Sequence, residues 1–75
     1  MTATEARANA EALRVKALAL YAEAKALSAE QWKDSVKRAF FAKLYEAIAA
    51  DDEYNAAVVI AMRLETEERR LGSAD

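Results

Sequence analysis

The chain has 75 residues, a formal net charge of −2 and a sequence pI near 5.1, so it holds one small domain without the excess positive charge that binds nucleic acid. Its single Gly and its lack of Pro and Cys exclude turn-rich β folds, disulfide scaffolds and thiolate metal sites. The lack of His removes the usual general base near neutral pH.

The first predicted helix spans about residues 3–27. Thr2-x-x-Glu5 matches a capping box, in which each of the two side chains satisfies a free backbone N–H group at the start of a helix. Two rows of apolar residues then recur at intervals of seven, the spacing of an a/d seam, and the row of small residues allows close approach of a partner helix. The rows are Ala6, Leu13, Leu20 and Leu27, interleaved with Ala3, Ala10, Ala17 and Ala24.

The second predicted helix spans about residues 29–49. Ser28-x-x-Gln31 matches another capping box and sets its start. Its apolar stripe is the most aromatic of the three predicted helices. The stripe consists of Trp32, Val36, Phe40, Leu44 and Ala47.

The third predicted helix spans about residues 53–71. Asp51-Asp52 supplies an N-cap, and negative charge there interacts favourably with the positive end of the helix dipole. Gly72 is placed to end the helix, because glycine enters the left-handed conformation without strain. The predicted core stripe is Ala57, Ile60, Ala61, Leu64 and Leu71.

Turns of only a few residues join these segments, and short connections make neighbouring helices run antiparallel. The predicted fold is therefore an all-α, up-down-up, antiparallel three-helix bundle. It forms a single domain over residues 1–75, with a short C-terminal tail at 72–75.

Several apolar residues fall outside these stripes, and they allow two interpretations. Either the bundle covers them and the alanines serve helix propensity alone, or they form an exposed patch that meets another molecule. For a protein partner, the candidate contact residues are Arg38, Phe41, Tyr45, Ile48, Val59 and Met62. For self-association through the Ala-rich strip of the first helix, they are Val15, Leu18, Ala19 and Ala22.

The motifs that would indicate catalysis or metal binding are incomplete in this sequence. Asp51-x-Glu53-x-Asn55 begins like a calcium loop, but Ala56 stands where the loop needs Gly and Met62 where it needs a bidentate acid. We therefore expect no enzymatic activity, no cofactor, no metal site and no nucleic-acid partner. The first residues lack the features of an export signal, and no apolar stretch has the length of a membrane span. These features predict a soluble, cytoplasmic protein.

The chain resembles a computationally designed three-helix miniprotein in its capped helices and short turns. Two segments, one rich in Ala and one rich in charged residues, add to this resemblance. The segments are ALALYAEAKAL at 17–27 and DDEYNAAVVIAMRLETEERR at 51–70. The resemblance covers the whole chain and includes no motif of a natural family. It implies a helical binder or a subunit of a designed assembly, to which no cellular location is assigned.

The expected function is a non-enzymatic protein–protein interaction module that presents an apolar and aromatic helix face to a protein partner. The first alternative is a self-associating helical scaffold, a homo-oligomer subunit that packs through the Ala-rich strip of the first helix. The second alternative is a small phage or bacterial helical inhibitor, which also acts by covering a surface of a larger target.

Overall fold

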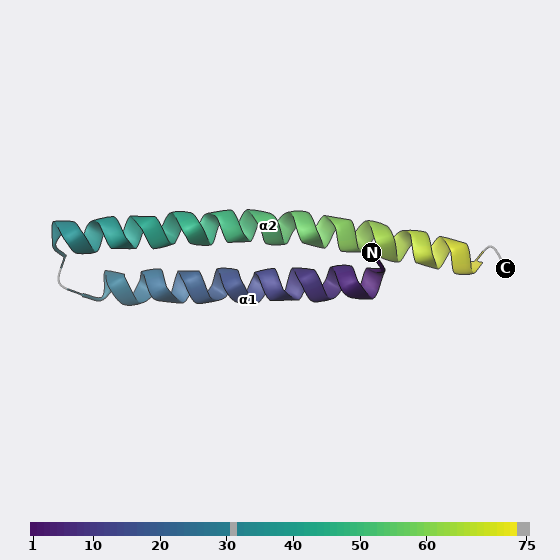
Figure 1. Cartoon of the computed structure of the whole chain (residues 1–75), viewed down its shortest axis with the longest axis horizontal. Coiled ribbons are helices and arrows are strands. Elements are labelled where there is room, and N and C mark those ends of the chain that lie inside the picture. Colours follow the sequence, from purple (N-terminus) through teal and green to yellow (C-terminus); the bar gives the residue numbers. More distant parts are fainter. Residues whose placement is uncertain (31, 74–75) are drawn as a thin grey trace.

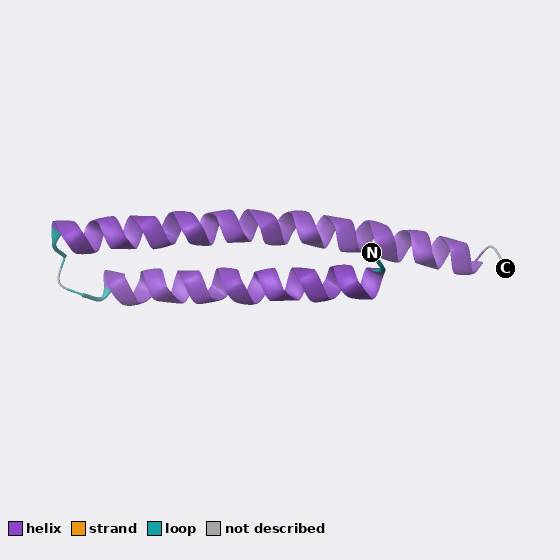
Figure 2. Cartoon of the chain, in the orientation of Figure 1, coloured by secondary structure: helices purple, strands orange, loops and turns teal. Residues whose placement is uncertain are grey.

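The protein is a two-helix hairpin. A computed structural model describes residues 1–30 and 32–73, and it contains α1 (Ala3–Ser28) and α2 (Asp34–Ser73), which run antiparallel (Figure 1). Helix accounts for nearly all of this part of the chain, with a short connection between α1 and α2 (Figure 2). The all-α class is confirmed. The three-helix bundle is wrong, because the second and third predicted helices are one continuous helix of 40 residues.

The predicted break at Asp51-Asp52 does not occur, and both residues lie within α2. Aspartate is favoured at an N-cap, but inside a helix it costs only about 0.7 kcal/mol relative to Ala. Ending the helix there would leave up to four carbonyl and four N–H groups without helical partners. Neither Gly nor Pro stands nearby to enforce a turn, so the helix continues.

A longer pattern in the sequence indicates this continuity. Seam positions in α2 follow one another at alternating steps of four and three without interruption, which is the repeat of one coiled-coil helix. A new helix after residue 52 would have no reason to keep the same register. The positions are Val36, Phe40, Lys43, Ala47, Ala50, Tyr54, Ala57, Ala61, Leu64, Glu68 and Leu71.

The start signal predicted at Ser28 is also wrong. Ser28 is the last residue of α1, and its hydroxyl donates to the backbone carbonyl of Lys25 at 2.7 Å. Its proposed capping partner, Gln31, lies outside the described residues. Gly72 does not end α2 in a left-handed conformation, because the helix passes through it and its φ is not positive.

The start of α1 follows the prediction. The Glu5 backbone N–H donates to the Thr2 hydroxyl at 3.2 Å, and the Thr2 backbone N–H donates to Glu5 Oε1 at 3.4 Å, so the capping box is present. The Ala3 backbone N–H donates to Glu68 Oε1 of α2 at 3.0 Å. A carboxylate is favourable at this positive helix end, and the bond fixes the start of α1 against α2.

The core between the helices consists of alanine. Every buried residue in the described part of the chain is Ala, which confirms the predicted close-packing row of α1. These residues are Ala3, Ala6, Ala10, Ala17, Ala24, Ala47, Ala50, Ala57 and Ala61. Small residues let helix backbones approach closely, but they bury little surface.

Most of the larger apolar residues therefore remain at the edge of the seam or outside it. The leucines predicted to line α1, namely Leu13, Leu20 and Leu27, are only half-buried. Ile60 and Leu71, predicted as core, are exposed. The Cα radius of gyration is 17.6 Å, whereas a compact chain of this length has a value of about 11 Å. The molecule is a ribbon of two helices with almost no interior.

Replacing Asp52 by Pro tests the continuity of α2. In the hairpin, this substitution removes an internal helical hydrogen bond at an exposed position and should cost about 3 kcal/mol of unfolding free energy or more. Asp34→Pro, in the first turn of α2, should cost little. Asp52→Ala controls for the lost charge. Urea unfolding followed by circular dichroism measures all three, and a harmless Asp52→Pro would restore the three-helix interpretation.

Replacing Ala47 by Leu tests the alanine seam. Ala47 is fully buried, so the added atoms should force the helices apart and cost about 1–3 kcal/mol. Ala49→Leu is the matched control, because Ala49 is exposed and should accept the larger side chain with little change. Equal stability of the two variants in urea would contradict an alanine-lined contact.

Candidate functional site

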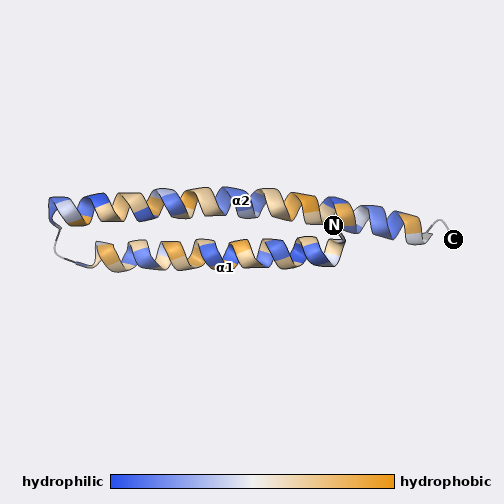
Figure 3. Cartoon of the chain, viewed as in Figure 1, coloured by the Kyte–Doolittle hydropathy of each residue, from blue (hydrophilic) through white to orange (hydrophobic). Residues whose placement is uncertain are grey.

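Large apolar side chains cover the outside of both helices. Within the described residues, twelve of them are exposed, and hydrophobic stretches, drawn orange, alternate with hydrophilic blue ones along both helices (Figure 3). They are Met1, Val15, Leu18, Tyr21, Trp32, Phe41, Tyr45, Ile48, Val59, Ile60, Met62 and Leu71. The surface they form is the candidate functional site, because large exposed apolar patches mark interaction sites in folded proteins.

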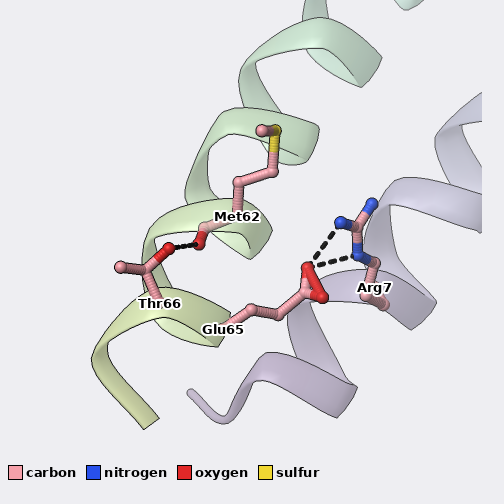
Figure 4. A network of polar contacts seen from close by, with 4 residues as sticks. All are labelled: Arg7, Met62, Glu65 and Thr66. Carbon is pink, nitrogen blue, oxygen red and sulfur yellow. Dashed lines mark hydrogen bonds and ion pairs between the residues drawn. The ribbon is translucent and has the colours of Figure 1, made fainter. Parts of the chain in front are cut away.

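Two ion pairs between the helices define the two faces of the ribbon. On one face the Arg7 Nε–H donates to Glu65 Oε1 at 2.6 Å, with Met62 and Thr66 beside the pair on α2 (Figure 4). These residues also line a shallow hollow of about 220 Å³. The other pair joins Glu23 and Lys43 at 3.2 Å and lies on the other side of the seam.

The seven-residue repeat shows which residues share the first face, because positions seven apart lie on one line of a coiled-coil helix. Arg14 and Tyr21 continue the line of Arg7 along α1. Leu18 lies between them, at helical steps of four and three. The face therefore has basic residues at one end of α1 and apolar residues further along it.

On α2, the same repeat places two apolar lines on this face. Leu44 and Val58 share the line of Glu65, whereas Phe41 and Ile48 share the line of Met62. Together with the two α1 residues they form the apolar part of a surface named here the Arg7–Glu65 face, in which Asp51 and Asn55 lie between the two apolar groups of α2. Its apolar residues are Leu18, Tyr21, Phe41, Leu44, Ile48, Val58 and Met62.

The predicted partner-binding residues divide between this face and the outer edge of α2. Phe41, Ile48 and Met62 lie on the Arg7–Glu65 face, and their side chains are 43% to 55% exposed. The other three, Arg38, Tyr45 and Val59, share the line of Thr66 opposite the seam. All six are exposed, so the interpretation that places them in a core is excluded. Their role in binding stays a prediction.

The predicted self-association residues divide in the same way. Leu18 reaches the Arg7–Glu65 face, whereas Val15 and Ala22 lie on the outer edge of α1 and Ala19 on the far side. Leu44 was missed because it was assigned to the core stripe of the second predicted helix, and Tyr21 and Val58 were not among the predicted contact residues. Their spacing from Arg7 and Glu65 in units of seven is the signal that would have found them.

The opposite face has fewer large apolar residues and more alanine. Lys43 lies half-buried at a seam position, and its ammonium contacts Glu23 and, at 3.4 Å, Glu46. Hydrogen bonds to these two carboxylates raise the pKa of Lys43. A shallow hollow on this face is bordered by charged residues and small Ala side chains, which makes it a poorer site for an apolar partner. Its lining is Lys16, Leu20, Glu46, Ala49, Ala50 and Glu53.

Aromatic residues gather at the closed end of the hairpin. The Trp32 and Phe40 rings meet edge to face with centroids 5.4 Å apart, and Phe40 and Phe41 do so at 5.3 Å. Such contacts add about 0.5–1.5 kcal/mol each beyond their burial. They hold Phe41 in place at the edge of the Arg7–Glu65 face.

Other kinds of site find no support in residues 1–30 and 32–73. In these residues no group of three or more acidic, His or Cys side chains is arranged to hold a metal. Within the same residues, neither helix has an apolar stretch of the length needed to cross a membrane. No protein-family model, curated protein or solved structure matches the chain.

Removing Arg14 tests the electrostatics of α1. Hydrogen bonding to the Arg14 guanidinium holds the pKa of Glu11 below its ordinary value of 4.5. We expect Arg14→Gln to raise this pKa toward the ordinary value. The contribution of Glu11 to stability is present above its unfolded-state pKa and is lost as pH falls through the lower folded-state pKa. Carboxyl NMR titration measures the shift, and an unchanged pKa would contradict the contact.

Proposed function

We propose that the hairpin is a non-enzymatic protein–protein interaction module, whose exposed apolar face packs against helices of a protein partner. The observation that carries this proposal is the separation of small from large apolar residues. In the described residues, the interior is alanine, whereas twelve large apolar side chains lie outside it. A helix with apolar residues on several sides is typical of one that is covered on several sides.

The energetics favour a covering partner. Burying a Leu, Ile, Met or Phe side chain contributes about 1.5–3 kcal/mol, and a ribbon of two helices leaves this contribution unused for most of its large residues. Ordering the backbone costs about 1–2 kcal/mol per residue, which alanine contacts offset poorly. A partner that covers the apolar face therefore stabilises the hairpin as well as binding it.

A second candidate function is that of a homo-oligomer subunit that packs through the Ala-rich strip of α1. The exposure of that strip supports it, because Val15 and Leu18 are 55% and 54% exposed and Ala19 and Ala22 are exposed beside them. Small residues around two larger ones allow a second helix to approach closely. This candidate shares the protein–protein contact of the first and differs in the surface used.

The general proposal predicts that the isolated single copy is incompletely stabilised. At the lowest concentration, where one copy is alone, we expect a broad thermal transition and binding of a dye that reports exposed apolar surface. Association should suppress dye binding and raise the melting temperature. Sedimentation, circular dichroism and dye fluorescence measure these quantities. A monomer with sharp, concentration-independent unfolding and no dye binding would overturn the proposal.

A further inference from the structure

One line of α1 on the Arg7–Glu65 face is self-complementary. Glu11, Leu18 and Lys25 follow one another at intervals of seven and therefore lie on the same line. When this line meets an antiparallel copy of itself at Leu18, each Glu11 lies opposite a Lys25. Arg14 and Tyr21 lie on the neighbouring line, and the point midway between them is close to Leu18. The same arrangement therefore places Arg14 of each copy opposite Tyr21 of the other. A guanidinium beside an aromatic ring is also a favourable pair.

The apolar lines of α2 have the same symmetry. Leu44 and Val58 are each seven residues from Asp51. Phe41 and Met62 are equally distant from the point midway between Asp51 and Asp52. An antiparallel copy of α2 centred there places Leu44 opposite Val58 and Phe41 opposite Met62. The same centre places Ile48 opposite Asn55, so two of these three pairs on each side of the centre are apolar.

The two centres lie at the same level of the hairpin. In residue number, Val15 lies midway between Arg7 and Glu23 on α1, and Tyr54 lies midway between Lys43 and Glu65 on α2. Because ion pairs join Arg7 to Glu65 and Glu23 to Lys43, Val15 and Tyr54 lie at the same height along the hairpin. Leu18 follows Val15 by three residues on α1, and Asp51 precedes Tyr54 by three residues on α2. Antiparallel helices rise equally per residue, so these residues are also level. One axis across the ribbon passes through both centres.

Charge favours the antiparallel arrangement of α2 against its copy. The first part of the helix, 34–50, has three basic and two acidic residues, whereas 51–73 has three basic and six acidic residues. An antiparallel copy brings the positive part against the negative part, which complementary interfaces require. A parallel copy would place the two negative parts together.

The area is also sufficient. The 26 residues of α1 extend about 39 Å, and two neighbouring helices are about 20 Å wide. Their shared face therefore has a footprint of about 800 Å², which is the area that each partner buries in a stable interface.

From these observations, and resting on the proposed function, we infer that the partner is a second copy of this chain. Two hairpins pack through their Arg7–Glu65 faces about a two-fold axis near Leu18 and Asp51, and they form an antiparallel four-helix dimer. Asp51 of each copy lies near the axis. Asp51 is half-buried in one copy, and the apolar pairs on either side act against the repulsion between the two carboxylates.

Single cysteines test the position of the axis, because the chain has no Cys of its own. In the full chain, Leu18→Cys places two thiols across the axis, whereas Val15→Cys places them on outer edges. The two positions are matched controls, with exposures of 54% and 55%. We expect Leu18→Cys to form covalent dimer at least about tenfold faster under mild oxidation. Faster crosslinking by Val15→Cys would overturn the inference.

Charge reversal tests the pairing of Glu11 with Lys25. Glu11→Lys and Lys25→Glu should each raise the dimer dissociation constant about three- to tenfold, and the double variant should restore it. The two residues are 14 positions apart on α1, about 21 Å, so they cannot meet within one copy. Sedimentation equilibrium measures the constants. A double variant no tighter than the single variants would overturn the inference.

The failures of the two proposals are distinguishable. A dimer that Val15→Cys crosslinks faster contradicts the inferred face but retains self-association through the Ala-rich strip. A folded monomer that binds the dye at millimolar concentration contradicts the second copy as partner but retains the interaction module. A stable monomer without dye binding contradicts both.

Discussion

The structure depends on the small size of the residues where its two helices meet. An alanine seam lets α1 and α2 lie close together along the length of α1, but alanine side chains bury little surface. The larger apolar residues are consequently displaced to the flanks and the outside. The same close contact that makes the ribbon narrow thus creates the exposed apolar surface that supports the proposed function. In a bundle with leucine in the seam, this surface would be smaller.

Polar contacts between α1 and α2 affect the register of the two helices more than the stability of the hairpin. Exposed ion pairs such as Arg7–Glu65 and Glu23–Lys43 contribute at most about 1 kcal/mol each. The buried alanines resemble one another in size, and on their own they would tolerate sliding of the helices by one repeat. The two ion pairs and the bond from Ala3 to Glu68 favour one register. That register decides which apolar residues of α1 lie beside those of α2.

The sequence was sufficient to predict the helical class, the Thr2–Glu5 cap and the alanine row of α1. The predicted helix start at Asp51-Asp52 was wrong, because residues that are favoured at an N-cap are also tolerated inside a helix. The residues before and after them decide whether a helix starts or continues. The unbroken seam from Val36 to Leu71 contains that information. The sequence left the exposure of Phe41 and Met62 as one of two interpretations, because a third helix would have covered part of the surface that a hairpin leaves open.

In the inferred dimer, the symmetry centre lies near the middle of both helices although α2 is longer than α1. Leu18 lies near the middle of α1, and Asp51 lies near the middle of α2, so an axis through both allows each helix to overlap its copy along most of its length. A centre near one end would leave long apolar overhangs. Asp51, one of the two acidic residues that resemble a helix start in the sequence, thus occupies the middle of the inferred interface. Its charge keeps that middle polar while apolar pairs form on either side, which disfavours packing that is shifted by one repeat.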